Sequence, residues 1–276
     1  MNRPEYLLDI PAKEYHAATK NLEFLSSHRL NLFRRCPALY IKHANGEIVE
    51  DDTAAFILGR ATHTRIIEGA ERFAAEYVVA DGPENPKTGK PYGRTTDKYR
   101  EWADAQTRPV IATEDAELIA KMDAAVHAHE KAAELLSAGF AEATVRGEWD
   151  GVPTQIRADW YDPERNILVD LKTCADVDRF QYDVRDHGYV FQLAYYAHQI
   201  AAARPDGETP DCWIVAVEKR EPFRVLVVRV LPYTIDVANN EDTPKNGPCN
   251  ANMIAELKEC RAADKWPTRY EGFEQI

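Results

Sequence analysis

The spacing of apolar residues along the chain predicts where helices lie. In several stretches they recur about every three to four residues, as on one face of an amphipathic helix. These stretches cover about residues 27–40, 54–69, 114–137, 189–203 and 250–263. Ser26-Ser27 supplies a cap for the first helix, and Pro37 should end it because its ring clashes with the preceding turn. Asp51-Asp52-Thr53 precedes the second helix.

A different pattern predicts the strands. Apolar and β-branched residues alternate with polar ones or form short runs, which is typical of a sheet. These segments cover residues 142–149, 153–161, 167–173, 212–218 and 223–231. Asp162-Pro163-Glu164-Arg165-Asn166 has the composition of a turn and should join the second strand to the third.

The order of the elements predicts the fold class. Helices come first, then a strand meander, a helix and two more strands, which indicates an α/β fold with a mixed sheet flanked by helices. We expect a single domain over residues 23–276, preceded by a polar leader at 1–22. Gly82 to Gly93, rich in Pro, Gly and Lys, should be an exposed loop. The tail after Pro232 is polar until the last predicted helix.

Composition narrows the class of protein. Of the 276 residues, 45% are hydrophobic and 29% charged, which is ordinary for a globular chain. No apolar run approaches the ~20 residues that span a bilayer, and the first residues have no signal-peptide core, so we expect a soluble cytoplasmic protein. The five cysteines are scattered without a Cys-x-x-Cys pair. This argues against a zinc ribbon, an iron–sulfur cluster or a disulfide scaffold.

The charge balance limits how the chain can bind nucleic acid. Its net charge of −12 argues against indiscriminate coating of DNA, since phosphate contacts need Lys and Arg. A local basic groove remains compatible with it. The basic residues cluster as Arg29, Arg34 and Arg35, as Arg60 and Arg65, and as Lys219, Arg220 and Arg224. Each cluster taken alone is more easily read as solvated surface charge.

Candidate chemistry lies in the hairpin of residues 153–173. Asp170 and Lys172 are two residues apart on one strand and point to the same face. With the turn near Glu164, Asp159 falls opposite Asp170 or one residue off. Directly opposed like charges destabilise a sheet, and Asp is a poor strand former. A bound divalent cation would compensate both, and oxygen ligands favour Mg²⁺ or Mn²⁺ over zinc.

Asp159, Asp170 and Lys172 together resemble the PD-(D/E)xK nuclease motif, with Asp170 in the place of the variable acid. Two further signatures resemble those of the RecB-like branch of that superfamily. They are Gly59-x-x-x-His63 on the second predicted helix and Gln192-x-x-x-Tyr196 after the core strands. The small Gly59 would let its helix approach the sheet closely, with His63 on the same face.

Within that branch the chain is most similar to the nuclease domain of RecE-type exonucleases (exonuclease VIII) and their phage relatives. This match runs from about residue 20 to about residue 270. The supporting segments are Ser27-x-x-Leu30-x-x-Phe33-x-x-Cys36-Pro37, Arg157-x-Asp159-Trp160, Val217-Glu218-Lys219 and Trp266-Pro267. The fold that the resemblance implies is a restriction-endonuclease-like PD-(D/E)xK core.

The resemblance also implies roles for individual residues. Asp159, Asp170 and His63 match metal ligands, with the backbone carbonyl of Leu171 as a further ligand, for Mg²⁺ with Mn²⁺ as a substitute. Lys172 matches the catalytic lysine that assists the attacking water.

Further residues complete the candidate site. Gln192 and Tyr196 match residues that position the DNA or the active site, and their i,i+4 spacing makes them neighbours on a helix. Glu142 is a tentative additional metal ligand, because relatives often carry an acid at the start of this strand. Glu148 competes for that role, and either acid is equally compatible with a solvated strand end.

Activity and partners follow only from the resemblance. It implies a 5′→3′ exonuclease on linear double-stranded DNA that leaves 3′ single strands for phage or prophage recombination. It also implies a ring-shaped homo-oligomer and a RecT-like single-strand annealing protein as partner. Arg34, Arg65 and Arg157 are the candidate DNA contacts.

Two other interpretations remain open. A RecB-like nuclease of the Cas4 kind would differ in polarity, and the missing cysteine set for an iron–sulfur cluster argues against it. A catalytically idle DNA-binding recombination protein would keep the fold, but the intact Asp159, Asp170 and Lys172 argue against loss of activity.

Overall fold

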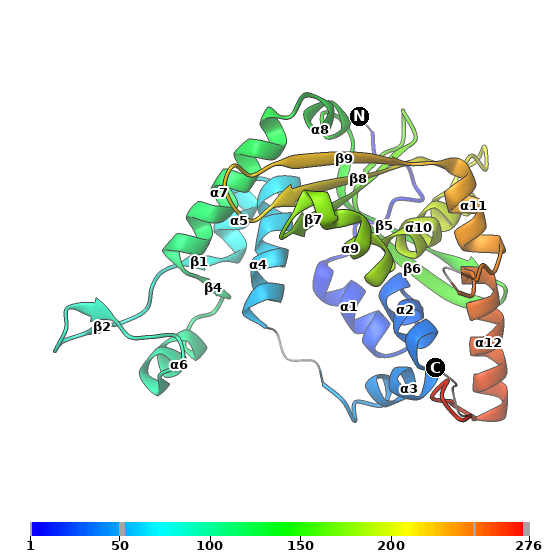
Figure 1. Ribbon diagram of the computed structural model, residues 1–276, viewed down its shortest axis with the longest axis horizontal. Helices are drawn as coiled ribbons and strands as arrows, with labels where there is room; N and C mark the ends of the chain where they lie inside the picture. The colour runs from blue at the N-terminus through cyan, green and yellow to red at the C-terminus, as the bar shows by residue number, and fades with distance from the viewer. Residues whose placement is uncertain (1, 50–52, 245–246, 273–276) are drawn as a thin grey trace.

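The computed structural model describes residues 2–49, 53–244 and 247–272. A five-stranded mixed sheet runs through the middle, with helices on both faces, as the α/β prediction requires (Figure 1). In spatial order its strands are β5 (Phe140–Trp149), β6 (Val152–Asp162), β7 (Ile167–Cys174), β8 (Asp211–Glu218) and β9 (Val225–Val230). β7 and β8 are parallel, and the other neighbouring pairs are antiparallel.

Local chemistry explains the connections. The predicted turn between β6 and β7 is confirmed, and Oδ1 of Asp162 accepts the backbone N–H groups of Glu164 (2.9 Å) and Arg165 (3.1 Å). The parallel pair needs a long crossover, because a tight turn can join only antiparallel strands. That crossover consists of η2 (Val177–Arg179), α9 (Phe180–Asp186) and α10 (Tyr189–Ala203).

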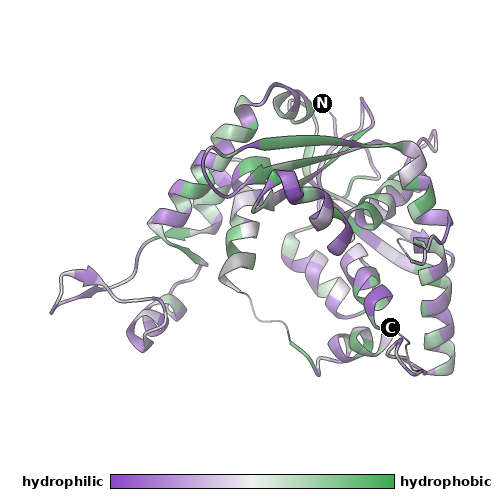
Figure 2. Cartoon of the chain, in the orientation of Figure 1, coloured by the Kyte–Doolittle hydropathy of each residue, from purple (hydrophilic) through white to green (hydrophobic). Residues whose placement is uncertain are grey.

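Two apolar clusters form the core, one on each face of the sheet (Figure 2). The helices α2 (Ser27–Arg35), α10, α11 (Pro232–Asn240) and α12 (Asn250–Ala263) lie over one face, and α4 (Ala54–His63), η1 (Thr64–Glu68) and α7 (Thr113–Ala128) over the other. Alternation along β7 serves both faces, since Leu168 packs in the first cluster and Val169 and Leu171 in the second. Asp170, between them, is 1% exposed.

The first predicted helix ends where expected. Oγ of Ser26 accepts the N–H of Arg29 at 3.4 Å and caps α2, which stops at Arg35. Pro37 then begins a further helix, α3 (Pro37–Ala44). A proline suits this first position because its missing N–H has no intrahelical partner there.

The second predicted helix is divided. Thr53 caps α4 through a hydrogen bond from the N–H of Phe56, and Asp51 and Asp52 lie outside the described residues. After His63 the coil widens into the π-helix η1, which ends at Gly69 with φ +95°. The helix α5 (Ala70–Glu76) follows directly.

One continuous helix over residues 114–137 is a wrong prediction. The backbone of His129 is extended, and its Nδ1 caps the separate helix α8 (Glu130–Leu135) by accepting the N–H of Ala132. Val126, Ala132 and Leu135 are all fully buried. The apolar stripe therefore continues across the break, which is why periodicity does not reveal it.

The ends of the chain hold more structure than their polarity indicates. The segment predicted as a leader contains α1 (Ala12–Lys20), and its Leu7 is 2% exposed in the core while Leu8 pairs with Thr144 of β5. The tail after Pro232 begins with α11, which packs against α10.

An exposed arm leaves the body at the far left of Figure 1. The predicted Gly82–Gly93 loop forms its tip as the short hairpin β2 (Glu84–Asn85) and β3 (Lys90–Pro91), followed by α6 (Asp97–Asp104). The parallel pair β1 (Val78–Val79) and β4 (Val110–Ile111) closes its base. No described helix is long and apolar enough to cross a membrane.

Candidate active site

The candidate site lies where β6 and β7 part. Their ladder ends with Trp160 opposite Val169, and Asp159 and Asp170 are the next residues toward the site. There Oδ2 of Asp159 accepts the backbone N–H of Leu171 at 2.7 Å, so a side chain replaces the backbone acceptor. Since the N–H and C=O of one strand residue point to the same side, the Leu171 carbonyl faces the same gap.

Glu142 completes a row of three carboxylates across the sheet. On β5 the residues on either side of it pair with Trp160 and Ala158, so Glu142 stands level with Asp159. Its φ of +51° lies in the left-handed region, where residues other than glycine are uncommon. Three acids at one level on neighbouring strands repel one another. Positive charge nearby is needed to offset this repulsion.

Lys172 supplies part of that charge. Its Nζ lies 2.6 Å from Oδ2 of Asp170. Burial raises the pKa of Asp170 to about 6, with Asp159 adding to the rise and Lys172 offsetting part of it. Burial by itself would lower the pKa of Lys172, but Asp170 and Asp159 together raise it above its usual value. The lysine therefore stays protonated inside the site.

His63 reaches the row of carboxylates from the helix α4. It is the last residue of α4, and its Nδ1 lies 3.5 Å from Oδ2 of Asp159. Burial opposes protonation of His63, but the Asp159 carboxylate outweighs it and raises the pKa of the imidazole. Burial likewise opposes ionisation of Asp159, and His63 with Lys172 holds its pKa below the usual value. The two side chains therefore stabilise each other's charged form.

The helix α10 brings the side chains of Gln192 and Tyr196 to the carboxylates. Nε2 of Gln192 lies 3.3 Å from Oδ1 of Asp170 and 3.1 Å from the hydroxyl of Tyr196, which is buried. The ring of Tyr189 lies 4.8 Å from Nζ of Lys172. Tyr189 is not among the residues predicted from the sequence, although its position one turn before Gln192 places it on the same face of the helix.

Arg157 is the direct partner of Glu142. Its Nε lies 2.5 Å from Oε2 of Glu142, and its Nη1 donates to the backbone carbonyl of Ile10 at 2.8 Å. Burial raises the pKa of Glu142 to about 7, and the nearby Asp159 adds to this, while Arg157 opposes it. Glu148, the competing candidate, is exposed at the far end of β5. The structure thus places Glu142, and not Glu148, beside Asp159.

The two other predicted DNA contacts bind protein groups. Arg34 donates to Asn31, to Asn250 and to the carbonyl of Pro248, and its guanidinium lies 3.8 Å from the Phe191 ring. Burial lowers the pKa of Arg34 to about 10. These contacts join α2 to α10 and α12.

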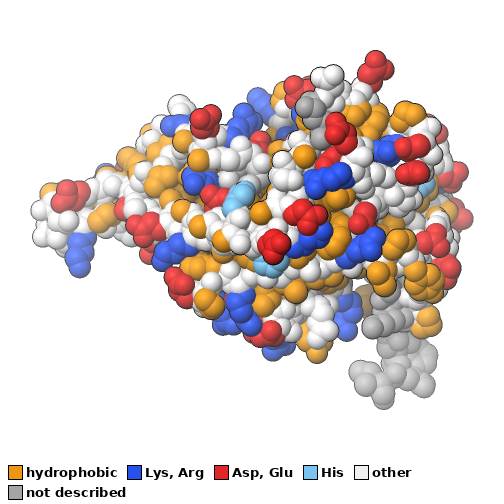
Figure 3. Space-filling view, turned by 90° about the horizontal axis from the view of Figure 1, so that it is seen from above, with side chains coloured by type: hydrophobic (Ala, Val, Ile, Leu, Met, Phe, Trp, Pro, Cys, Tyr) orange, Lys and Arg blue, Asp and Glu red, His pale blue; other side chains and the backbone are white. Residues whose placement is uncertain are grey.

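Arg65 follows His63 on η1 and donates to Oδ2 of Asp123 at 2.8 Å. On the face seen in Figure 3, basic and acidic side chains are interspersed, without a broad surface of one sign. Contact of Arg34, Arg65 and Arg157 with DNA remains a prediction.

Gly59 does not bring α4 close to the sheet. A Cβ added at this residue would meet no heavy atom within 4 Å. The interpretation that its small size permits a close approach is therefore wrong, and His63 reaches Asp159 without that help.

Comparison with known proteins shows the family to which the chain belongs. Residues 26–276 match the family described as "PDDEXK-like domain of unknown function (DUF3799)". The chain belongs to this PDDEXK-like family. The family lies in the PD-(D/E)xK nuclease superfamily, as the sequence resemblance indicates.

One solved structure shares the fold of this PDDEXK-like domain. The crystal structure of a protein from Eubacterium rectale, provisionally named an exonuclease, superimposes with a TM-score of 0.66 at 15% identity, over 98% of this chain and 96% of that chain. A phage related exonuclease from Haemophilus somnus 129PT aligns with a TM-score of 0.34 at 15% identity, over 90% and 95%. No curated protein matches the chain.

PDDEXK nucleases generally use divalent metal ions, which need several donor atoms in one place. Within residues 2–49, 53–244 and 247–272, no three His, Cys, Asp or Glu side chains converge as a metal site. Asp170 is paired with Lys172 and Asp159 with His63 instead. Even so, Oδ2 of Asp170 is buried without a hydrogen bond of normal geometry. Two carboxylates, an imidazole and a facing carbonyl form a donor set that suits a divalent cation.

Proposed function

We propose that the protein is a Mg²⁺-dependent deoxyribonuclease of the RecE type. It digests one strand of linear double-stranded DNA in the 5′→3′ direction. The observation that carries the proposal is the meeting of Asp159, Asp170, His63 and Lys172 at the gap between β6 and β7. Membership of the PDDEXK-like family supports the nuclease chemistry. The RecE-type segments of the sequence support the polarity.

The side chains have distinct tasks in this proposal. Asp159, Asp170 and His63 would hold the cation, which when bound supplies a Lewis acid for the phosphodiester and a more acidic water. Lys172, kept protonated by its acidic neighbours, donates hydrogen bonds to the attacking water or to a phosphate oxygen beside Asp170. Gln192 holds Oδ1 of Asp170, and the Tyr196 hydroxyl fixes the orientation of the Gln192 amide.

Glu142 offers a further carboxylate at the edge of the same row. Arg157 binds Glu142 on one side, and Asp159 on the neighbouring strand β6 lies on the other. We propose that Glu142 is a second acidic ligand, oriented by Arg157. A ring-shaped homo-oligomer and a RecT-like annealing partner are proposals that rest on the resemblance alone, and light scattering of the purified chain tests the first.

The decisive experiment is digestion of end-labelled linear duplex with and without Mg²⁺. Wild type is compared with Asp170→Ala and Lys172→Met, and with the matched controls Asp178→Ala and Lys219→Met, whose side chains are exposed. We expect digestion by the wild type and by both controls only with Mg²⁺, and a loss of at least about a hundredfold in the two site variants. Digestion that persists in EDTA, or in Asp170→Ala, would refute the proposal.

The same assay separates the competing interpretations. Phosphorothioate links at the 5′ ends should block digestion, whereas links at the 3′ ends should not, and closed circular DNA should survive. The opposite end dependence would favour a nuclease of other polarity. Binding without digestion would favour an idle recombination protein. The Cas4 interpretation also needs an iron–sulfur cluster, while no three cysteines of the described residues come together as a metal site.

A further inference from the structure

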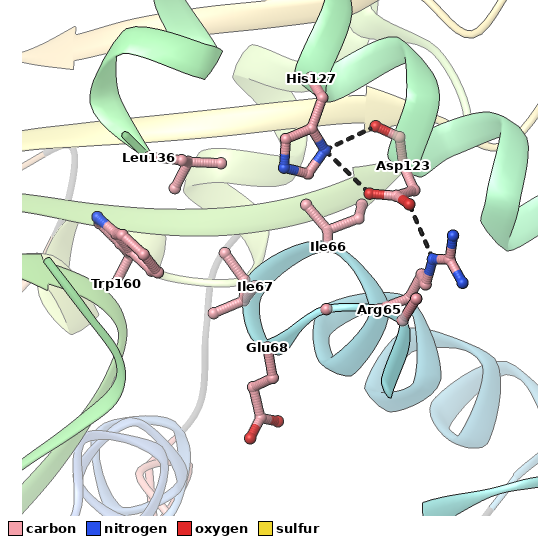
Figure 4. A pocket seen from close by; sticks show the side chains of 10 residues that line it. Arg65, Ile66, Ile67, Glu68, Asp123, His127, Leu136 and Trp160 are labelled. Carbon is pink, nitrogen blue, oxygen red and sulfur yellow. Dashed lines mark hydrogen bonds and ion pairs between the residues drawn. The ribbon is translucent and has the colours of Figure 1, made fainter. Parts of the chain in front are cut away.

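A cavity of about 370 Å³ lies beside η1 (Figure 4). Residues of η1, α7 and β6 line it, together with Ala70 of α5 and Leu136 at the end of α8. Its apolar walls are Ile66, Ile67, Leu136 and Trp160, and its charged side chains are Arg65, Glu68, Asp123 and His127. A volume of this size lies within the range of small-molecule sites, and the polar side chains that line it are nearly as many as the apolar ones.

Asp123 orients two of the polar groups. Its Oδ2 binds Nε of Arg65 at 2.8 Å, and its Oδ1 lies 2.9 Å from Nδ1 of His127. Within residues 2–49, 53–244 and 247–272, the other ring nitrogen of His127, Nε2, has no hydrogen-bond partner, and it points toward Ile67 and Trp160 in Figure 4. Among the described residues, the Nη groups of Arg65 make no hydrogen bond. Glu68 points away from this trio.

The cavity adjoins the candidate active site. A second cavity of about 400 Å³ shares Ile67 and Glu68 with it and is lined by Glu142 and Arg157. The two cavities therefore meet at Ile67 and Glu68, and Glu142 of the second belongs to the carboxylate row.

We propose that this cavity holds one unpaired nucleotide of the DNA strand that occupies the candidate active site. The base packs between Trp160 and Ile67, with Nε2 of His127 hydrogen-bonded to its edge, and Arg65 binds the adjoining phosphate. Aromatic side chains stack with any base, and a guanidinium fork matches the geometry of a phosphate. The inference rests on the proposed nuclease function, because it assumes a DNA strand beside Asp159.

The first test removes one base at a time. Duplexes with a short 5′ single-stranded end, each with one abasic residue, are titrated against the protein in EDTA by fluorescence anisotropy. At one position, loss of the base should weaken binding by between about fivefold and a hundredfold, the usual range for one stacked base. In Trp160→Leu the same abasic residue should cost less than about twofold.

His127→Ala gives a second route to the same answer, because this side chain is half exposed and its loss should not disturb folding. Lys121→Ala, on the same helix and outside the cavity, is the matched control. If no position depends on its base, or if the dependence persists in both Trp160→Leu and His127→Ala, the cavity does not hold a nucleotide of the strand.

The phosphate contact has its own readout. In Arg65→Gln the slope of log affinity against log salt should become shallower by about 0.7, as expected for one lost single-strand phosphate contact. Lys121→Gln should leave the slope unchanged. A purely structural Arg65 would weaken binding without altering the slope, which would remove that half of the proposal.

Free mononucleotide serves as the competing probe. Competition by deoxynucleoside monophosphate without any base dependence in the strand would assign the cavity to free nucleotides and overturn the proposal. Because binding is measured in EDTA, the result is independent of cleavage. A protein that digests no DNA in Mg²⁺ but shows the base dependence would refute the nuclease proposal alone.

Discussion

Replacing Asp170 by Asn should make the metal-free protein more stable while abolishing its proposed activity. Asp170 is 1% exposed, and burial together with the neighbouring Asp159 raises its pKa to about 6 from the ordinary 3.8. The folded chain therefore holds a proton on Asp170 at pH values where the unfolded chain has released it. Stability falls as pH rises through this window, because the folded state binds more protons than the unfolded state.

The size of the effect follows from these two values. A difference of about two pKa units at ~1.4 kcal/mol each corresponds to about 3 kcal/mol. Asn resembles the protonated carboxyl, so Asp170→Asn should exceed wild type in unfolding free energy by about 1–2 kcal/mol near pH 5 and about 3 kcal/mol near pH 8. In the variant, Asp159 still raises the pKa of Lys172 against the effect of burial.

Urea unfolding in EDTA across this pH range measures the difference directly. Asp178→Asn, whose side chain is 74% exposed, is the control and should stay within about 0.5 kcal/mol of wild type. Added Mg²⁺ at about a hundredfold above its dissociation constant should stabilise wild type by about 2.7 kcal/mol and the variant much less. If Asp170→Asn is less stable than wild type at every pH, the ion pair with Lys172 outweighs the burial of Asp170, and the reasoning is refuted.

Three further substitutions test other parts of the structure. Gly59→Ala should raise stability by up to about 1 kcal/mol in thermal unfolding, since its Cβ meets open space and Ala favours helix; a loss would restore the close-approach interpretation. Arg34→Met should lower stability by about 2–4 kcal/mol through its lost hydrogen bonds and leave the salt dependence of DNA binding unchanged, whereas a phosphate contact would lower that slope by about one. Glu142→Gln should reduce digestion in Mg²⁺ at least about tenfold with DNA affinity in EDTA unaltered; full activity would remove Glu142 from the metal site.

Some residues of the candidate site are predictable from the sequence and others are not. Asp159, Asp170 and Lys172 are predictable because they lie on one short hairpin, whose turn and two-residue period fix the register within a residue. His63 came only from the family resemblance, since a helix contributes no local signal for what its last residue will meet. The structure places its Nδ1 3.5 Å from Asp159.

Glu142 is a residue whose place in the site the strand pattern does not predict. Strand periodicity alone left it equal to Glu148, because both acids lie on the same strand at like positions. The left-handed backbone at Glu142 and the register with β6 decide between them, and both are properties of paired strands. Likewise the apolar stripe through residues 114–137 is continuous, so it could not show that His129 turns the chain.

The sequence by itself determined the class of fold, the strand meander and the acidic hairpin with its lysine, because these depend on periodicity and on turns between neighbours in the chain. Tertiary structure alone decided which acid stands beside Asp159, how Lys172 pairs with Asp170, and that a cavity beside η1 joins Trp160 to His127. A periodic pattern reports which face of an element is buried. It carries no information on the distance to an element that packs against that face from elsewhere in the chain.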